Sequence, residues 1–563
     1  MVLITGFSQN DVEIDKIKDN LKSKIDKTLK SKPLKINGAL AVNLIATVSS
    51  ASNPQPFTYV ATGNVNVSLF GYSLPFNFTY SNRKFAYVNP SFEFNRAAFN
   101  PKYKNWAGHF GDVSMSFSPY TLSGFQFKGA GLEYLPQKWK FQILAGRFLK
   151  AVGEDTSGRI TPSYERLGTG MKCGYYGDKS KIGLSVFYAK DAKNSIQAPE
   201  KIQYSEIKPM ENLSFAIELG VPIHKKITLE TEFSTSILTH DLNEQKLPIN
   251  QRSDLLMNLL PNKNVTTQLY HALKVGLNYA VGETGTVGLG YERVDPNYRT
   301  LGGHYFANDF ENITVNTQFK GKVNTRFSTG IQRDDLANTG KSSLNRMVVS
   351  AGMNFKPVEK LDISLNYSNF QSYTFIRSPF DRINRITPFD NLDTLNYTQL
   401  SQNSGVNMSY NIKQSEKGSQ MINANINFME SSNQRNQIGG EGSEFINTGL
   451  NYAWSITEKD LGLSMGFNYS LNKGQSSNVT WGPLISANKK LFKKKVTANV
   501  ALSYNRNKLP ETLTQVVNLN VAANMILKEK HNFNFNFTTQ YRSITIQPTL
   551  INITATLGYN FSF

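Results

Sequence analysis

Strict alternation of apolar and polar residues, sustained over long stretches, is the feature that most constrains the fold of this chain. The clearest stretch ends at the last residue and places on one face Ile551, Ile553, Ala555, Leu557, Tyr559, Phe561 and Phe563. A period of two residues is the signature of a β-strand, whose successive side chains point to opposite faces. Such stretches cover about 10–15 residues here, whereas strands of soluble sheets usually have about 5–6. The greater length is what a tilted strand needs to cross a lipid bilayer.

The same pattern recurs along most of the chain, for example over residues 36–48, 461–469, 496–504, 517–527 and 533–537. The second face of these stretches carries mainly Asn, Thr, Ser and Gly, which tolerate contact with water. A mean hydropathy of −0.37 would suit a soluble protein. A membrane barrel has a polar average as well, because only every second residue faces lipid. No run of about 18 apolar residues occurs, which excludes helical membrane spans.

Short and long connections alternate between the predicted strands. Short ones lie at 135–138, 177–180, 282–284, 356–360 and 457–460. Longer polar segments lie near 152–164, 191–211, 238–265, 296–309, 334–344, 371–396 and 433–443. Short periplasmic turns and long external loops are typical of membrane barrels. The sequence therefore predicts an all-β protein in which residues 34–563 form a large antiparallel transmembrane β-barrel of about 22–26 strands.

The amino-terminal residues differ from the rest of the chain. Residues 1–9 are apolar and end in small or polar residues, which we interpret as the remnant of a signal peptide. Residues 10–33 predict a short amphipathic helix that ends at Pro33, with an apolar stripe made by Ile14, Ile17, Leu21, Ile25 and Leu29. This helix either leans on the periplasmic rim of the barrel or plugs its lumen.

The final residues, Gly558-Tyr559-Asn560-Phe561-Ser562-Phe563, resemble the C-terminal β-signal of outer-membrane proteins. The resemblance implies a barrel in the outer membrane of a Gram-negative bacterium, in contact with lipid and lipopolysaccharide. It also implies that the barrel-assembly machinery recognises Leu557, Tyr559, Phe561 and Phe563. The composition, rich in Asn and Lys, is similar to that of barrels from the Bacteroidota. The segment 118–131 resembles a family-specific hairpin to which no activity is attached.

The positive net charge does not indicate nucleic-acid binding, and the single cysteine excludes an internal disulfide. The net charge is +19, from 61 Lys and Arg against 42 Asp and Glu. The lysines lie mostly in the amino-terminal segment and in short turns, not in one stripe interleaved with aromatic residues, so nucleic acid is not an expected partner. Cys173 is the only cysteine and has no partner for an internal disulfide.

The sequence predicts no enzyme, cofactor or metal. None of the six histidines lies in a metal-binding spacing, and no GxSxG motif occurs. The pair His240-Asp241 in a long loop could act with a distant Ser or carboxylate, but one such pair is expected by chance. The pairs Glu154-Asp155 and Asp334-Asp335 lack the alternating oxygen ligands of a Ca²⁺ loop, which favours solvated loop charge. Arg147 and Arg326 lie on predicted strands. They could line the lumen and favour anions, or pair with residues of neighbouring strands.

Barrel size gives the remaining argument about function. Barrels of about 16–18 strands already leave an aqueous channel, so an open barrel of about 26 strands would leak solutes. We expect the lumen to be filled by the loops near 191–211, 238–265 and 371–396, by the amino-terminal helix, or by a partner. The expected role is a channel or transport pore across the outer membrane. The alternative is a barrel subunit of a multiprotein secretion or protein-assembly complex, with other envelope proteins as partners.

Overall fold

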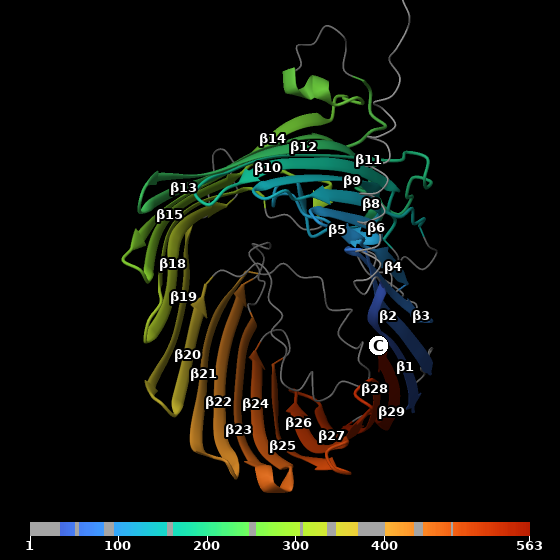
Figure 1. Ribbon diagram of the computed structural model, residues 1–563, viewed down its shortest axis with the longest axis vertical. Helices are drawn as coiled ribbons and strands as arrows, with labels where there is room; N and C mark the ends of the chain where they lie inside the picture. The colour runs from blue at the N-terminus through green and yellow to red at the C-terminus, as the bar shows by residue number, and fades with distance from the viewer. Residues whose placement is uncertain are drawn as a thin grey trace, which may run out of the picture.

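The alternating stretches form the strands that the sequence predicts, as the computed structural model shows (Figure 1). The structure describes residues 34–50, 56–83, 95–154, 161–246, 255–303, 308–334, 345–369, 400–432, 443–473, 477–545 and 547–563. The predicted signal-peptide remnant (1–9) and the predicted helix (10–33) lie outside the described residues, so both stay predictions.

Twenty-seven strand segments form one sheet. They are β1 (Leu34–Ser49), β2 (Phe57–Leu69), β3 (Tyr72–Ser81), β4 (Arg96–Phe99), β5 (Lys102–Tyr103), β6 (Trp106–Ser114), β8 (Gln126–Tyr134), β9 (Trp139–Leu149), β10 (Arg166–Tyr176), β11 (Lys181–Asp191), β12 (Glu211–His224), β13 (Ile227–Thr239), β14 (Thr267–Val281), β15 (Gly285–Val294), β17 (Phe310–Phe319), β18 (Val323–Asp334), β19 (Asn345–Val358), β20 (Leu361–Ser368), β21 (Leu400–Ser415), β22 (Gly418–Ser432), β23 (Ser443–Ile456), β24 (Leu461–Lys473), β25 (Asn478–Leu491), β26 (Val496–Lys508), β27 (Leu513–Leu527), β28 (His531–Ile544) and β29 (Gln547–Ser562). Two-residue strands β7 (Leu122–Ser123) and β16 (Gly302–Gly303) form a separate small sheet, and the 3₁₀ helices are η1 (Ile202–Tyr204), η2 (Leu255–Leu259) and η3 (Thr457–Lys459).

The large sheet closes on itself, because β1 pairs antiparallel with both β2 and the last strand, β29. The segments β4 and β5 both pair with β3 and β6, so together they fill one strand position. Twenty-seven segments therefore give 26 positions around the barrel, within the predicted range. Closure leaves no unpaired sheet edge, which removes the aggregation hazard that an open sheet of this size would carry.

The two ends of the barrel differ in their connections. Short turns such as 70–71, 225–226, 416–417 and 528–530 lie at the end of the barrel where β1 begins and β29 ends. We call this the short-turn end and the opposite one the long-loop end. None of the helices among the described residues is long and apolar enough to cross a membrane.

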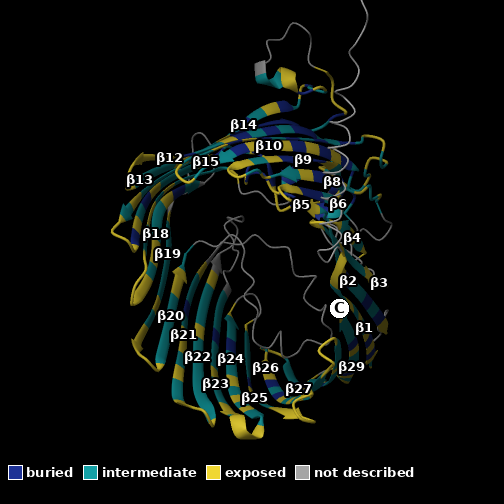
Figure 2. Cartoon of the chain, viewed as in Figure 1, coloured by how far each residue is buried: buried dark blue, intermediate teal, exposed yellow. Residues whose placement is uncertain are grey.

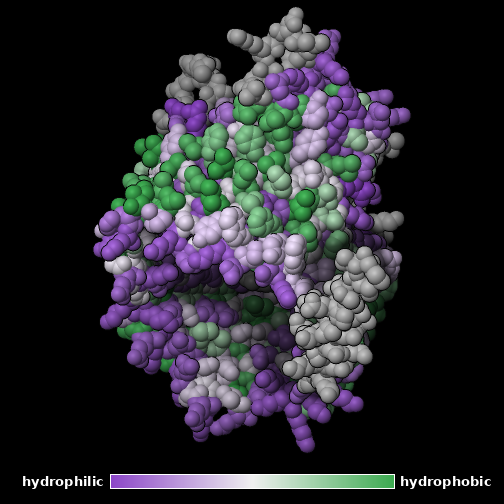
Figure 3. All heavy atoms as spheres, turned by 45° about the horizontal axis from the view of Figure 1, so that its top comes forward, coloured by the Kyte–Doolittle hydropathy of each residue, from purple (hydrophilic) through white to green (hydrophobic). Residues whose placement is uncertain are grey.

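The outward face of the wall is apolar. On β9, the exposed side chains of Phe141 and Ile143 alternate with the buried Gln142 and Leu144. Ile426 and Leu450 are likewise exposed on strands that lie across the barrel from β9. Figure 3 shows apolar residues gathered over one side of the outer surface, with hydrophilic residues around them. An exposed apolar surface of this extent marks contact with another apolar phase.

Candidate functional site

Two connections of the long-loop end fold into the barrel and lie against its wall. Residues 115–125 join β6 to β8, and residues 295–303 follow β15; we call them the inner segments. The inner segments pair with each other in parallel through β7 and β16. The Tyr298 hydroxyl donates to the carbonyl oxygen of Tyr120 at 2.8 Å, and the Thr300 hydroxyl donates to that of Thr121. Figure 2 shows that buried residues concentrate in this part of the barrel.

Aromatic rings fill hollows that glycines leave in the wall beneath the inner segments. A Cβ atom on Gly170 of β10 would lie 2.7 Å from Cε2 of Phe117, and one on Gly168 would lie 2.7 Å from Cε2 of Phe148. Phe187 of β11 and Leu122 of the first inner segment are fully buried in the same cluster. Each such side chain contributes about 1.5–3 kcal/mol by leaving water. The main apolar core of the described residues therefore lies inside the barrel and fixes the inner segments to the wall.

Carboxylates on the lumen face of the wall hold the polar groups of the first inner segment. The Ser118 hydroxyl donates to Glu232 of β13, and the Tyr120 hydroxyl donates to Glu292 of β15 at 2.6 Å. Lys172 of β10 donates to Glu218 and to the carbonyl oxygen of Phe117. Burial, and then the nearby Glu292 carboxylate, raise the pKa of Tyr120 well above its ordinary value. The phenol therefore stays protonated and remains a hydrogen-bond donor.

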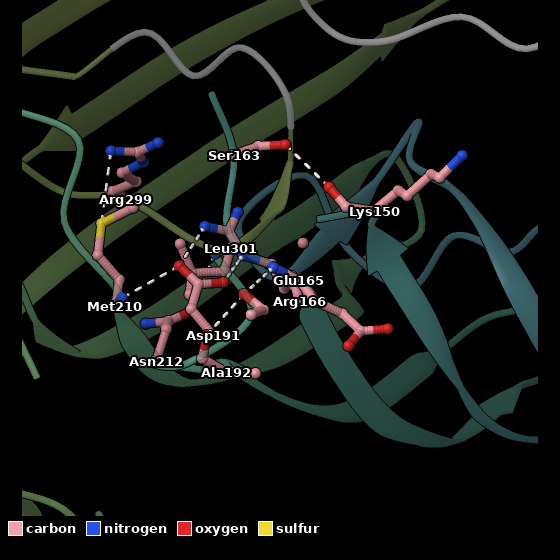
Figure 4. Close-up of polar contacts among 12 residues, drawn as sticks. Lys150, Ser163, Glu165, Arg166, Asp191, Ala192, Met210, Asn212, Arg299 and Leu301 are labelled. Carbon is pink, nitrogen blue, oxygen red and sulfur yellow. Dashed lines mark hydrogen bonds and ion pairs between the residues drawn. The ribbon is translucent and has the colours of Figure 1, made fainter. Parts of the chain in front are cut away.

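A buried ion pair joins β10 to β11 near the long-loop end (Figure 4). Arg166 Nε lies 2.7 Å from Asp191 Oδ1, and Nη2 lies 3.0 Å from Oδ2. The two side chains are only 7% and 2% exposed. Asp191 Oδ2 also accepts from the backbone N–H of Met210 at 3.0 Å, which ties the connection 192–210 to the barrel. Two parallel hydrogen bonds to a carboxylate are the strongest geometry available to arginine.

The lumen face of β20 to β24 has a different chemistry. Nine of the asparagines on it form what we call the amide wall: Asn366, Asn403, Asn407, Asn423, Asn425, Asn427, Asn447, Asn451 and Asn468. Serine and glycine occupy most of the positions between them. On β21 to β24, no lumen-facing side chain among the described residues is charged. The lumen thus has one charged side, covered by the inner segments, and one uncharged side.

The two predicted lumen arginines lie on opposite faces of the barrel. Arg326 of β18 is on the lumen face, since it alternates with the exposed Phe327 and pairs with Gln318 and Gly352. Its effect on ions stays a prediction. Arg147 pairs with the outward-facing Leu167, and its Nη1 lies 3.7 Å from Glu165 Oε1. This outward position differs from the lumen position that the sequence suggested.

Two of the loops proposed to fill the lumen lie elsewhere in the part that the structure describes. The described part of 240–266 lies above the ring of strands in Figure 1, and the connection 192–210 lies at the edge of the ring, with Met210 packed against the core inside it. There, Asn262 Nδ2 donates to the fully buried Glu211 at 2.8 Å, and Lys193 donates to the carbonyl oxygen of Leu242. The loop 371–396 lies outside the described residues. Within the described residues, the inner segments lie in the lumen, a position that the sequence did not predict for them.

The other residues singled out by the sequence have structural contacts. His240 Nε2 lies 2.8 Å from the Tyr270 hydroxyl, and burial lowers the pKa of His240. Glu154 pairs with Lys201 at 3.5 Å, while Asp155 and Asp335 lie outside the described residues. In the part of the chain that the structure describes, no cluster of three His, Cys, Asp or Glu could hold a metal ion. Cys173 is exposed.

The proposed β-signal residues lie on the outward face of the closing strand. Leu557 pairs with Leu44 and is exposed, while Tyr559 pairs with Val42. The backbone N–H of Phe563 donates to Gly38 at 3.0 Å, which completes the seam of the barrel. Recognition of Leu557, Tyr559, Phe561 and Phe563 by an assembly machinery stays a prediction.

Comparison with known proteins gives structural likenesses only. No protein-family model and no curated protein matches the sequence. The chain resembles the P pilus usher (PapC) translocation pore with 11% identity over 93% of this chain and 99% of the usher, at a TM-score of 0.41. It resembles the FrpB iron transporter from Neisseria meningitidis with 10% identity over 94% of this chain and 83% of that one, at 0.37. It also resembles the siderophore receptor PiuA from Acinetobacter baumannii, with 12% identity over 95% of this chain and 82% of the receptor, at a TM-score of 0.36. The function is therefore inferred from the barrel itself.

Proposed function

We propose that this chain is a channel for polar solutes across the outer membrane of a Gram-negative bacterium. The observation that carries the proposal is the combination of an apolar exterior with a polar lumen in a closed barrel of 26 strand positions. The apolar exterior can contact lipid. Because the sheet is closed, the backbone N–H and C=O groups of the wall form hydrogen bonds between strands and need no water. By analogy with other outer-membrane barrels, the short-turn end faces the periplasm and the long-loop end faces the cell exterior.

The inner segments support a restricted channel in place of an open hole. They occupy one side of the lumen and are fixed there by the core around Phe117, Leu122 and Phe187. The amide wall on the other side is compatible with water throughout. The inner segments would then form a fixed constriction, and solutes would pass through water between them and the amide wall.

Planar-bilayer recording tests the proposal. The protein is purified in mild detergent from its native level of expression, and mass spectrometry defines the composition of the same sample. We expect stable conductance from the chain alone. A silent barrel that carries stoichiometric companions would contradict the channel and would identify a subunit of a larger envelope complex.

A charge change at Arg326 should alter ion selectivity. Arg326→Glu places a carboxylate on the lumen face of β18, so the reversal potential in a salt gradient should shift toward cation preference. The shift should weaken as salt rises, because the Debye length falls from about 10 Å at 0.1 M to about 3 Å at 1 M. Arg147→Gln is the matched control, since Arg147 faces outward and should leave the reversal potential unchanged. Equal shifts in both variants would disprove the assignment of faces.

A further inference from the structure

A hollow lies on the lumen side of the barrel, where the amide wall approaches the short-turn end. Its volume is about 850 Å³, and its polar lining includes Asn354, Ser364, Asn407, Asn423, Asn425 and Asn468. This volume falls in the range of small-molecule sites, about 300–1,000 Å³. The lining comes from the turn before β18 and from β18 to β24, so a rigid sheet holds most of the polar groups in place.

Glycines set the orientation of the amides in this wall. Gly449 of β23 lies in register between Asn425 of β22 and Asn468 of β24. A Cβ atom on Gly449 would lie 2.5 Å from Oδ1 of Asn425 and 3.0 Å from Oδ1 of Asn468. The two amides therefore extend over the glycine from both sides. Gly405 repeats the arrangement one step along the wall, with Asn366 and Asn427 as its neighbours.

The wall offers hydrogen bonds without charge. Each asparagine amide provides two donor hydrogens and an acceptor oxygen, which complements a hydroxyl group that both donates and accepts. The Asn447 side chain is buried, and its Oδ1 has no hydrogen-bond partner among the described residues. An ion at the centre of the wall would lose hydration and find no counter-charge on β21 to β24. The charged residues of the lining are Lys322, Lys356 and Asp362, of which Lys356 and Asp362 pair with each other 3.0 Å apart.

We propose that this hollow is a binding subsite for an uncharged, polyhydroxylated solute, namely a neutral oligosaccharide. The inference rests on the proposed channel function and names its substrate class. A sugar matches the wall because its hydroxyls are spaced along a rigid frame and carry no net charge. A charged solute of the same size gains no compensating ion pair from the lumen face of β21 to β24, where the amides lie.

Direct binding tests the subsite whether or not the barrel conducts. The full chain in detergent is titrated with maltotriose, and separately with trigalacturonate, a trisaccharide of similar size that carries carboxylates. Saturation-transfer NMR should report contact with maltotriose and none with trigalacturonate. In a conducting bilayer, maltotriose should also cause resolved interruptions of the single-channel current.

Two substitutions locate the binding at the amide wall. Asn425→Asp adds a charge, and Gly449→Ala displaces the two neighbouring amides; each should weaken maltotriose binding on the order of tenfold, the effect of about one lost hydrogen bond. The matched control is Gly352→Ala on the lumen face of β19, where a Cβ atom meets nothing within 4 Å. It should bind maltotriose like the unmodified chain.

The outcomes separate this inference from the channel function. Conductance without maltotriose contact, or equal contact from both trisaccharides, overturns the subsite and leaves the channel in place. Binding that survives both Asn425→Asp and Gly449→Ala overturns its location at the amide wall. Maltotriose binding without conductance supports the subsite and contradicts the channel.

Discussion

Replacing residues 115–125 with a two-residue Asn-Gly turn should raise the single-channel conductance severalfold. The segment occupies the lumen beside β8 to β15, and its removal widens the path for ions. The wall can accommodate the change, because Ser114 of β6 already pairs with Gln126 of β8. A tight hairpin turn of the Asn-Gly type joins antiparallel strands at such a pair. The conductance of single channels in planar bilayers measures the effect.

Shortening an outer connection provides the control. Removal of residues 196–200, which lie in the connection between β11 and β12, should leave the conductance unchanged, because that connection lies at the edge of the ring of strands in Figure 1. Circular dichroism of both variants checks that the β-structure persists. If the 115–125 variant folds and conducts like the unmodified chain, the first inner segment does not restrict the path. If the outer deletion has the larger effect, the constriction lies at the long-loop end.

The architecture of the wall is predictable because its signal is local. Each strand carries its own alternation, and each turn fixes which end comes next, so neither requires knowledge of distant contacts. The faces of the two arginines follow from the same signal. Arg147 has the parity of Phe141 and Ile143, which predicts the outward face, whereas Arg326 alternates with Phe327. Consistent use of parity would therefore have separated the two residues from the sequence alone.

The inner segments depend on distant contacts, and their position was not predicted. Thr121 meets Thr300, and Tyr120 meets Glu292, across more than 170 positions of sequence. Two local signs were nevertheless present. The loop 115–125 is rich in large apolar residues, unlike the polar outer loops, and the lumen face of β10 carries Gly168 and Gly170 where other strands carry asparagine. Apolar loop residues opposite a glycine-lined wall indicate a segment that docks inside a barrel.

Loss of Arg166 should be the most destabilising single change at the buried ion pair of Figure 4. Arg166→Met leaves the Asp191 carboxylate with the backbone N–H of Met210 as a hydrogen-bond donor, in a site where that carboxylate is only 2% exposed. Breaking a buried pair in this way costs about 3–5 kcal/mol, because the remaining charge has lost its ion-pair partner in a site that gives it little solvent. The free energy of unfolding from lipid vesicles in urea should fall by that amount.

Two further variants decide whether the cost comes from the orphaned charge. The double variant Arg166→Met with Asp191→Leu removes both charges and should recover most of the lost free energy of unfolding, since apolar replacement of a buried pair is often neutral. Lys138→Ala breaks an exposed pair with Asp178 at a short turn, 2.6 Å apart, and should leave the free energy of unfolding nearly unchanged, because solvent screens such a pair. A double variant as unstable as Arg166→Met alone would show that the bidentate geometry itself, and not the uncompensated carboxylate, holds β10, β11 and the connection 192–210 together.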